Sequence, residues 1–207
     1  MLTAIKPPNN GINPTRSARW LCRPWGIHQH PEIALINLQL LFTNALAYSL
    51  ALSLVLATIM LISAYIAPDM WVGDYPPDIK ERFGPMSARA SRLRPYVAVV
   101  FFLALLAVPL SGLFSLQSTF GHIPFLSALA FSSLVLLVFN LFDLLVLDWL
   151  LFCTIQPRLM VLPGTEGMAG YRDYWFHFVG FLKGLGFCTV GGLVIASIWA
   201  VIQTLVA

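Results

Sequence analysis

Charged residues are scarce in this chain: Asp, Glu, Lys and Arg make up 10% of its 207 residues, whereas hydrophobic residues make up 58%. A soluble globular domain carries about 25% charged residues. This composition excludes a water-soluble domain, and the mean hydropathy of +0.81 agrees with a bilayer as the solvent. The net charge is only +3, which gives no indication of a nucleic-acid partner.

Cysteine is also scarce, with three residues at positions 22, 153 and 188. Their odd number and wide spacing do not suit a disulfide framework, and two of them lie in apolar stretches, where they are expected to be packing residues. The chain has no Cys-x-x-Cys or His-x-x-x-His element and no P-loop pattern. We therefore expect no metal and no cofactor.

Long apolar stretches are what the sequence does contain, at Ile33–Ile66, Tyr96–Leu116, Phe125–Ile155 and about Gly184–Val206. A bilayer crossing needs about 20 residues as a helix. The pattern predicts an all-α, polytopic integral membrane protein with four transmembrane helices, a basic N-terminal tail and a structured interfacial loop between the third and fourth helices. In the first stretch we expect the crossing near Phe42–Ile66, with an interfacial or tilted segment before it.

Two regions follow from this pattern: a tail at residues 1–32 and a four-helix transmembrane domain at residues 33–207. The tail alternates arginines with Trp20 and Trp25, a combination that favours the headgroup zone, so we expect it to be interfacial or disordered. Its histidines, His28 and His30, are expected to be solvated rather than metal-bound.

The distribution of Lys and Arg predicts the orientation, because cytoplasmic loops carry an excess of them. The connections at 67–95 and 156–183 hold eight of the twelve, and the tail holds the other four. Both connections are therefore expected in the cytoplasm, with the lipid bilayer as the main partner and the plasma membrane as the compartment.

Small residues recur every four positions in the last span, at Gly180, Gly184, Cys188, Gly192 and Ala196. Such a face lets two membrane helices approach closely. The partner could be another span of this chain, a second copy in a homo-oligomer, or another membrane protein, and a span of the same chain is the simplest of these.

Asn140 and Asp143 are intramembrane polar residues three positions apart, so on an α-helix they share a face. They could form a proton or cation site. The alternatives are a structural hydrogen bond to a neighbouring helix or an ion pair with Lys183. Asp148 would lie about 140° from Asp143 around an α-helix, which disfavours a paired-carboxylate site on this helix alone.

The connection after the third span contains Pro157, which ends that helix, and a Pro-Gly-Thr-Glu-Gly string typical of a tight turn. Asp173 is expected to cap a helix that starts at Tyr174, and it could orient His177 four residues later. The candidate catalytic residues are those that this membrane face would bring together: Asp148, Glu166, Asp173 and His177.

Three functions fit these patterns. The sequence favours a small membrane scaffold or accessory subunit that packs through the glycine face. A proton-linked or small-solute transporter would use Asn140 and Asp143. An interfacial membrane enzyme would use Asp148, Glu166, Asp173 and His177, and the sequence leaves open whether the chain is an enzyme.

Overall fold

The computed structural model describes the backbone of residues 31–206 and the side chains of residues 38–205. Residues 1–30, and with them the predicted interfacial tail and its two histidines, lie outside the described residues. Residues 37–207 form one compact unit, which contains all the membrane-length helical segments described below.

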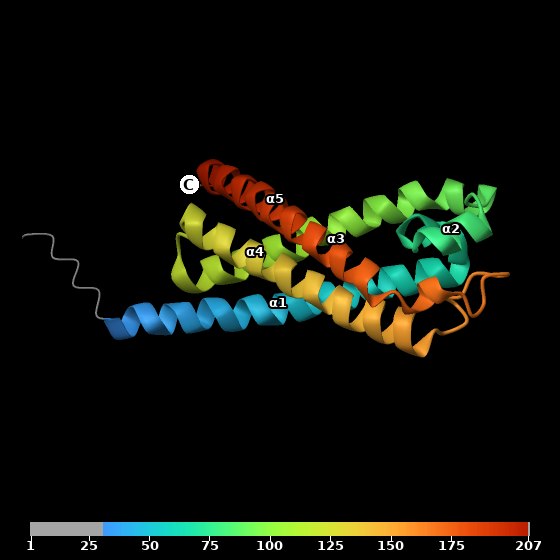
Figure 1. Cartoon of the computed structure of the whole chain (residues 1–207). Helices are drawn as coiled ribbons and strands as arrows, with labels where there is room; N and C mark the ends of the chain where they lie inside the picture. The colour runs from blue at the N-terminus through green and yellow to red at the C-terminus, as the bar shows by residue number, and fades with distance from the viewer. Residues whose placement is uncertain (1–30, 207) are drawn as a thin grey trace, which may run out of the picture. The chain divides into compact units, whose positions relative to one another are not determined.

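The described chain is built from helices (Figure 1): α1 (Pro31–Ile66), α3 (Ala88–Phe120), α4 (Phe125–Phe142) continued by η2 (Asp143–Ile155), and α5 (Tyr174–Val206). Four segments are long and apolar enough to cross a membrane: Leu38–Ile66, Ala88–Phe120, Phe125–Ile155 and Tyr174–Leu205. Short helices occupy the connections, namely η1 (Pro68–Asp74), α2 (Pro77–Phe83) and η3 (Ala169–Arg172). Residues 31–206 contain no strand, and the prediction of an all-α, four-span membrane fold is confirmed.

The first helix is continuous from Pro31 to Ile66 and includes the segment expected before the crossing. One helix boundary differs from the sequence prediction. The second membrane helix begins at Ala88 instead of Tyr96, because Ser87 caps it. The Ser87 hydroxyl accepts from the Ala90 N–H at 3.2 Å, and the Ser87 N–H donates to Asp69 Oδ2 at 2.6 Å. These two bonds give hydrogen-bond partners to the backbone N–H groups at the start of the helix, so the helix begins well before the apolar run.

From Asp143 onward the third span is a π-helix instead of an α-helix. The Gln156 N–H donates to Leu151 O at 2.8 Å, five residues back, and Thr154 Oγ1 donates to Trp149 O at 2.7 Å. In a π-helix, hydrogen bonds join residues five apart, so those residues share a face. Asp143 and Asp148 therefore lie on one side of η2. The prediction that they point apart is wrong because it assumed α geometry.

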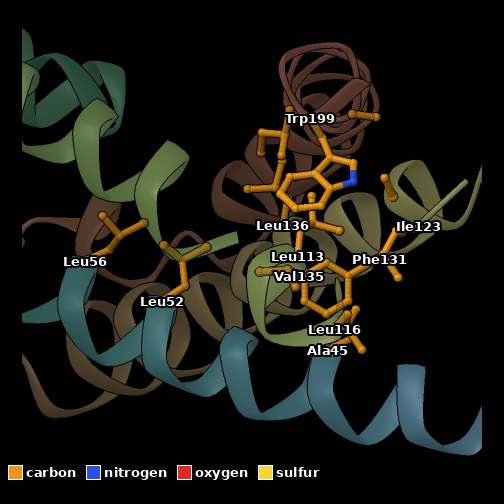
Figure 2. Packing of buried hydrophobic residues seen from close by; sticks show 13 residues of the cluster. Ala45, Leu52, Leu56, Leu113, Leu116, Ile123, Phe131, Val135, Leu136 and Trp199 are labelled. Carbon is orange, nitrogen blue, oxygen red and sulfur yellow. The ribbon is translucent and has the colours of Figure 1, made fainter. Parts of the chain in front are cut away.

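The main hydrophobic cluster holds together the half of the unit that contains the α3–α4 turn (Figure 2). It draws buried side chains from all four long helices, among them Leu52 of α1, Leu113 of α3, Phe131 of α4 and Trp199 of α5. The Trp199 ring packs edge-on against Phe114 at 4.9 Å between centroids, a geometry that aromatic pairs prefer.

A second cluster occupies the opposite end, where α2 and the connection after η2 lie together in Figure 1. Its buried members are Val72, Tyr75, Ile79, Phe152, Cys153, Leu162 and Tyr171. The Tyr75 hydroxyl donates to Met160 O at 2.9 Å, and the Tyr171 hydroxyl accepts from the Leu162 N–H at 2.8 Å. The first bond joins the two connections into one folded cap, and the second is internal to the loop after η2, as expected of a structured loop.

The turn in this loop has the backbone that its glycines suggest. Gly164 and Gly167 have φ of 81° and 76°, in the left-handed region that glycine adopts without strain. Gly170 meets α2 closely: its N–H donates to Asp78 Oδ2 at 2.9 Å, and a Cβ there would collide with the same carboxylate. The loop is thus tied to α2 through its backbone.

Helices α4 and α5 pack against each other along the small-residue face of α5. A Cβ at Gly184 would collide with the Asn140 side chain, and one at Gly192 would collide with Ser133. Ala196 is fully buried and Cys188 is half-buried beside the main cluster. Gly180 has open space where a Cβ would be. The close contacts at Gly184 and Gly192 are therefore made within one chain.

Candidate functional site

A cavity of about 610 Å³ lies between the two hydrophobic clusters. Along α4 and η2 it spans Phe139 to Phe152, and along α5 it spans Phe176 to Lys183. Most of its wall is apolar or aromatic. The side chains in the wall that are charged or carry an imidazole are Asp74, Lys80, Asp143, Asp148, His177 and Lys183. Ionisable side chains gathered around one mostly apolar cavity mark it as the candidate site.

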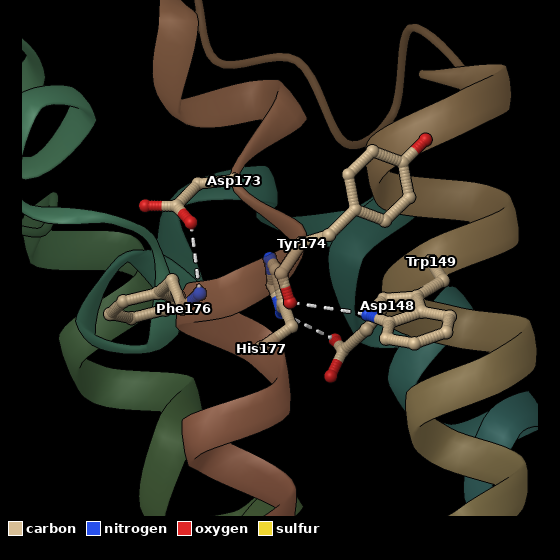
Figure 3. A network of polar contacts seen from close by, with 6 residues as sticks. All are labelled: Asp148, Trp149, Asp173, Tyr174, Phe176 and His177. Carbon is tan, nitrogen blue, oxygen red and sulfur yellow. Dashed lines mark hydrogen bonds and ion pairs between the residues drawn. The ribbon is translucent and has the colours of Figure 1, made fainter.

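His177 and Asp148 form the best-defined contact in this cavity (Figure 3). His177 Nδ1 lies 3.0 Å from Asp148 Oδ1, and the His177 side chain is only 6% exposed. The rings of Phe152 and Phe176 lie 4.8 and 5.3 Å from the imidazole, measured between centroids. Nε2 is buried and has no hydrogen-bond partner. In the tautomer whose Nδ1–H donates to the Asp148 carboxylate, Nε2 carries the lone pair and is a hydrogen-bond acceptor.

Asp143 supplies a second unpartnered atom in the cavity wall. Its Oδ1 is buried without a hydrogen-bond partner, and π geometry places it one turn from Asp148. Among residues 38–205 the one contact of a carboxylate with a Lys, Arg or His side chain at salt-bridge distance is that of Asp148 with His177, so the ion pair considered between Asp143 and Lys183 is not formed. Asn140 instead makes a structural bond: its Nδ2 donates to Phe181 O of α5 at 3.1 Å.

Of the four candidate catalytic residues, the structure brings Asp148 and His177 together and places the other two elsewhere. Asp173 caps α5 as expected, since its Oδ1 accepts from the Phe176 N–H at 2.9 Å (Figure 3). The expectation that Asp173 orients His177 is wrong, because Asp148 occupies that role. Glu166 is exposed in the tight turn, where hydrogen bonds from its own N–H and that of Gly164 lower the pKa of its carboxyl.

The first connection contributes wall residues that the sequence analysis did not single out. Trp71 and Asp74 come from η1 and its end, and Lys80 comes from α2. Lys80 Nζ donates to Gly73 O at 3.3 Å and lies 5.9 Å from the centroid of the Phe176 ring. Nothing in the sequence distinguishes these residues from an ordinary polar loop. Contacts of Trp71 hold this connection against the spans: its Nε1 donates to Ser63 Oγ of α1 at 2.9 Å, and its ring lies 6.4 Å from that of Phe101 of α3, measured between centroids.

The fold and the cavity define a four-span integral membrane protein with an ionisable cavity inside its helical bundle. Comparison of the chain with protein-family models, with curated proteins and with solved structures finds no match. In the part of the chain that the structure describes, no group of three or more His, Cys, Asp or Glu side chains is arranged to hold a metal ion.

Proposed function

We propose that this protein is a proton-linked transporter of a small solute and that the cavity is its binding site. The observation that carries the proposal is that two side chains lining the cavity, Asp143 and His177, each have a buried atom without a hydrogen-bond partner, Oδ1 and Nε2 respectively. A buried polar atom without a partner costs about 1–3 kcal/mol. A proton or a solute that binds there would offset that cost.

In this proposal each polar residue of the wall has a separate role. Asp143, which has no protein partner at Oδ1, exchanges a proton against the solute. Asp148 holds the imidazole of His177 in one orientation, so Nε2 can accept a proton as the solute leaves. Asn140 fixes α4 against α5 beside this pair through its bond to Phe181.

The scaffold or accessory subunit favoured by the sequence stays a prediction. Gly184 and Gly192 of the small-residue face lie against Asn140 and Ser133 of the same chain, so these two glycines offer no free surface to a partner protein. We rank the transporter above it because a scaffold has no need of a cavity lined by ionisable side chains with unpartnered atoms.

One observation favours an interfacial enzyme as the second candidate. A histidine held at Nδ1 by a carboxylate, with Nε2 free of any hydrogen-bond partner in the described residues, resembles the arrangement of a general base, although Nε2 itself is buried. The described wall of the cavity contains no Ser, Thr or Cys. The base would therefore activate water for hydrolysis of a lipid or headgroup.

Transport is tested with the full chain in vesicles that contain a pH-sensitive dye. A pH gradient is imposed, and an organic cation, an organic anion, a zwitterion and a neutral solute are added in turn. We expect one class to produce a proton flux, and Asp143→Asn to reduce that flux at least tenfold. Glu166→Gln, which changes an exposed carboxylate outside the cavity, is the matched control and should leave the flux unchanged.

The same vesicles separate the two candidates. Flux that is unchanged in Asp143→Asn, or absent for all four classes, would refute the transporter. Lipid breakdown products that appear over time in vesicles with the wild-type chain, and that are lost with His177→Gln, would support the enzyme instead.

A further inference from the structure

We infer that the solute is a small organic cation with an apolar body, whose positive charge is held between Asp143 and Asp148. This inference rests on the proposed function and names the chemical class that the cavity selects. Besides the carboxylates, it depends on His177, a nearly fully buried side chain in the cavity wall whose Nε2 has no partner.

Among the charged groups that η2, α2 and α5 contribute to the wall, Asp143 is the one whose carboxylate is available to a solute. The Lys80 ammonium already donates to Gly73 O and lies over the Phe176 ring, and the Lys183 side chain is exposed. Asp148 interacts with His177 through Oδ1. Because η2 places Asp143 and Asp148 on one face, an ammonium between them would interact with both carboxylates.

Aromatic rings line the cavity and suit the body of such a cation. Trp71 and Phe101 lie 6.4 Å apart between ring centroids, and so do Phe101 and Phe139. All three line the cavity, together with Phe152, Phe176 and Phe181. Ring faces attract organic cations, and ring surfaces bury apolar groups. The volume of about 610 Å³ lies within the range of about 300–1,000 Å³ that is usual for small-molecule sites.

The same wall disfavours the other solute classes. An anion would lie against Asp143 and Asp148, where like charges repel in a poorly solvated setting. A divalent inorganic cation is usually held by several carboxylate and other oxygen ligands, and the described residues offer no group of three or more His, Cys, Asp or Glu side chains that could hold a metal ion. A neutral solute would leave the Asp143 carboxylate without a counter-charge.

The test measures binding of tetraphenylphosphonium and of tetraphenylborate, two ions of the same shape and opposite charge, to the full chain in nanodiscs. We expect saturable binding of the cation, at least tenfold weaker in Asp143→Asn and several-fold weaker in Phe101→Leu. Glu166→Gln should bind as the wild type does. Preference for tetraphenylborate, or equal binding of the cation by Asp143→Asn, would overturn the inference.

A second measurement needs no variant, in case Asp143→Asn does not fold. A carbodiimide that modifies membrane carboxyls is applied to the wild-type chain, and the adduct on Asp143 is followed by mass spectrometry. Tetraphenylphosphonium should slow this modification at least fivefold, while the rate at Glu166 stays the same. Equal rates at Asp143 with and without the cation would contradict the inference.

Two further comparisons distinguish a lipid headgroup from a free solute, and a failure of this inference from a failure of the proposed function. The cation should bind equally in nanodiscs of phosphatidylglycerol and of phosphatidylcholine; displacement by the choline lipid would assign the site to a lipid headgroup instead of a free solute. Proton flux with a zwitterion, an anion or a neutral solute, but none with a cation, would overturn the inference and leave the transporter in place. No flux with any class would refute both.

Discussion

The imidazole of His177 lies between two aromatic rings, and its one charged partner is a carboxylate from a different span. Asp173, only four residues away along the chain, has a different role as the cap of α5. Both carboxylates are thus used, one in a local bond and one across two helices. The local bond is the kind that spacing along the chain can predict, whereas the distant one depends on how η2 and α5 pack.

Tyr171 is the residue whose loss should most clearly weaken the loop between the third and fourth spans. Its hydroxyl is buried, accepts from the Leu162 N–H and contacts Thr165 Oγ1 at 2.7 Å. Tyr171→Phe leaves the Leu162 N–H unsatisfied, so we expect a loss of about 1–3 kcal/mol in unfolding free energy. Denaturant unfolding in mild detergent measures it.

Tyr65→Phe is the matched control for this change, since the Tyr65 side chain is 82% exposed. It should leave the unfolding midpoint where it is. A Tyr171→Phe midpoint equal to that of Tyr65→Phe would show that the hydroxyl of Tyr171 contributes nothing to the cap.

At the scale of elements, the start of α5 depends on Asp173. Replacing an N-cap carboxylate by alanine costs about 1 kcal/mol, whereas asparagine preserves the cap. The Asp173 carboxylate accepts a hydrogen bond from the Phe176 N–H. We therefore expect Asp173→Ala to raise the rate of backbone hydrogen exchange at Phe176 and Asp173→Asn to leave that rate low. Equal exchange in the two variants would contradict the capping role.

A second prediction at this scale concerns the face of α5 that packs on α4. A Cβ at Gly184 would collide with Asn140, so Gly184→Ala should destabilise the protein by about 1–3 kcal/mol. Gly186→Ala, two residues further on, places its Cβ in open space and should be neutral or slightly stabilising. The difference between the two unfolding free energies is the measurement; no difference would refute close packing at Gly184.

The elements show how far the sequence can be used for prediction. The four spans follow from apolar length, and the cap of α5 and the glycine turn follow from local chemistry. The π-helix does not, because η2 is apolar on almost every side and its hydropathy has no period from which a register could be inferred. For the same reason, the sequence could not predict that Asp143 and Asp148 share a face, which is the centre of the candidate site.

At the scale of the whole molecule, the main and second hydrophobic clusters lie toward opposite ends of the unit, and a smaller third cluster is formed by Ala67, Met70 and Ala90. The main cluster is built from the spans and from Ile123 of the α3–α4 turn. The second needs both connections, which meet through Tyr75 and Met160 and through Asp78 and Gly170. Pairings of this kind join distant parts of the chain, so the presence of Asp74 and Lys80 in the cavity could not be predicted from the sequence.

The arrangement of the spans predicts which connections share a side of the membrane. In a chain without its native cysteines, single cysteines at Glu81 and Glu166 should react alike with an impermeant maleimide, and one at Ser118 should behave oppositely; all three positions are exposed. The Lys and Arg distribution predicts that, in intact cells, only the cysteine at Ser118 is labelled.

Each outcome of that labelling has a definite meaning. Glu81 and Glu166 on opposite sides would refute the four-span topology. Labelling at Glu81 and Glu166 with Ser118 protected would keep the four-span topology and reverse its orientation. The N-terminal arginines would then determine the orientation more strongly than the Lys and Arg residues of the loops.

The π geometry of η2 also bears on attempts to engineer this protein. A redesign of residues 143–155 for ideal α-helical hydrogen bonding would be expected to improve backbone regularity and thermal tolerance. It would also rotate Asp148 away from both Asp143 and His177. A chain optimised in this way should insert and fold well yet lose the solute binding that we propose for the cavity. Selection for heat resistance alone would then discard the residues that give the cavity its chemistry.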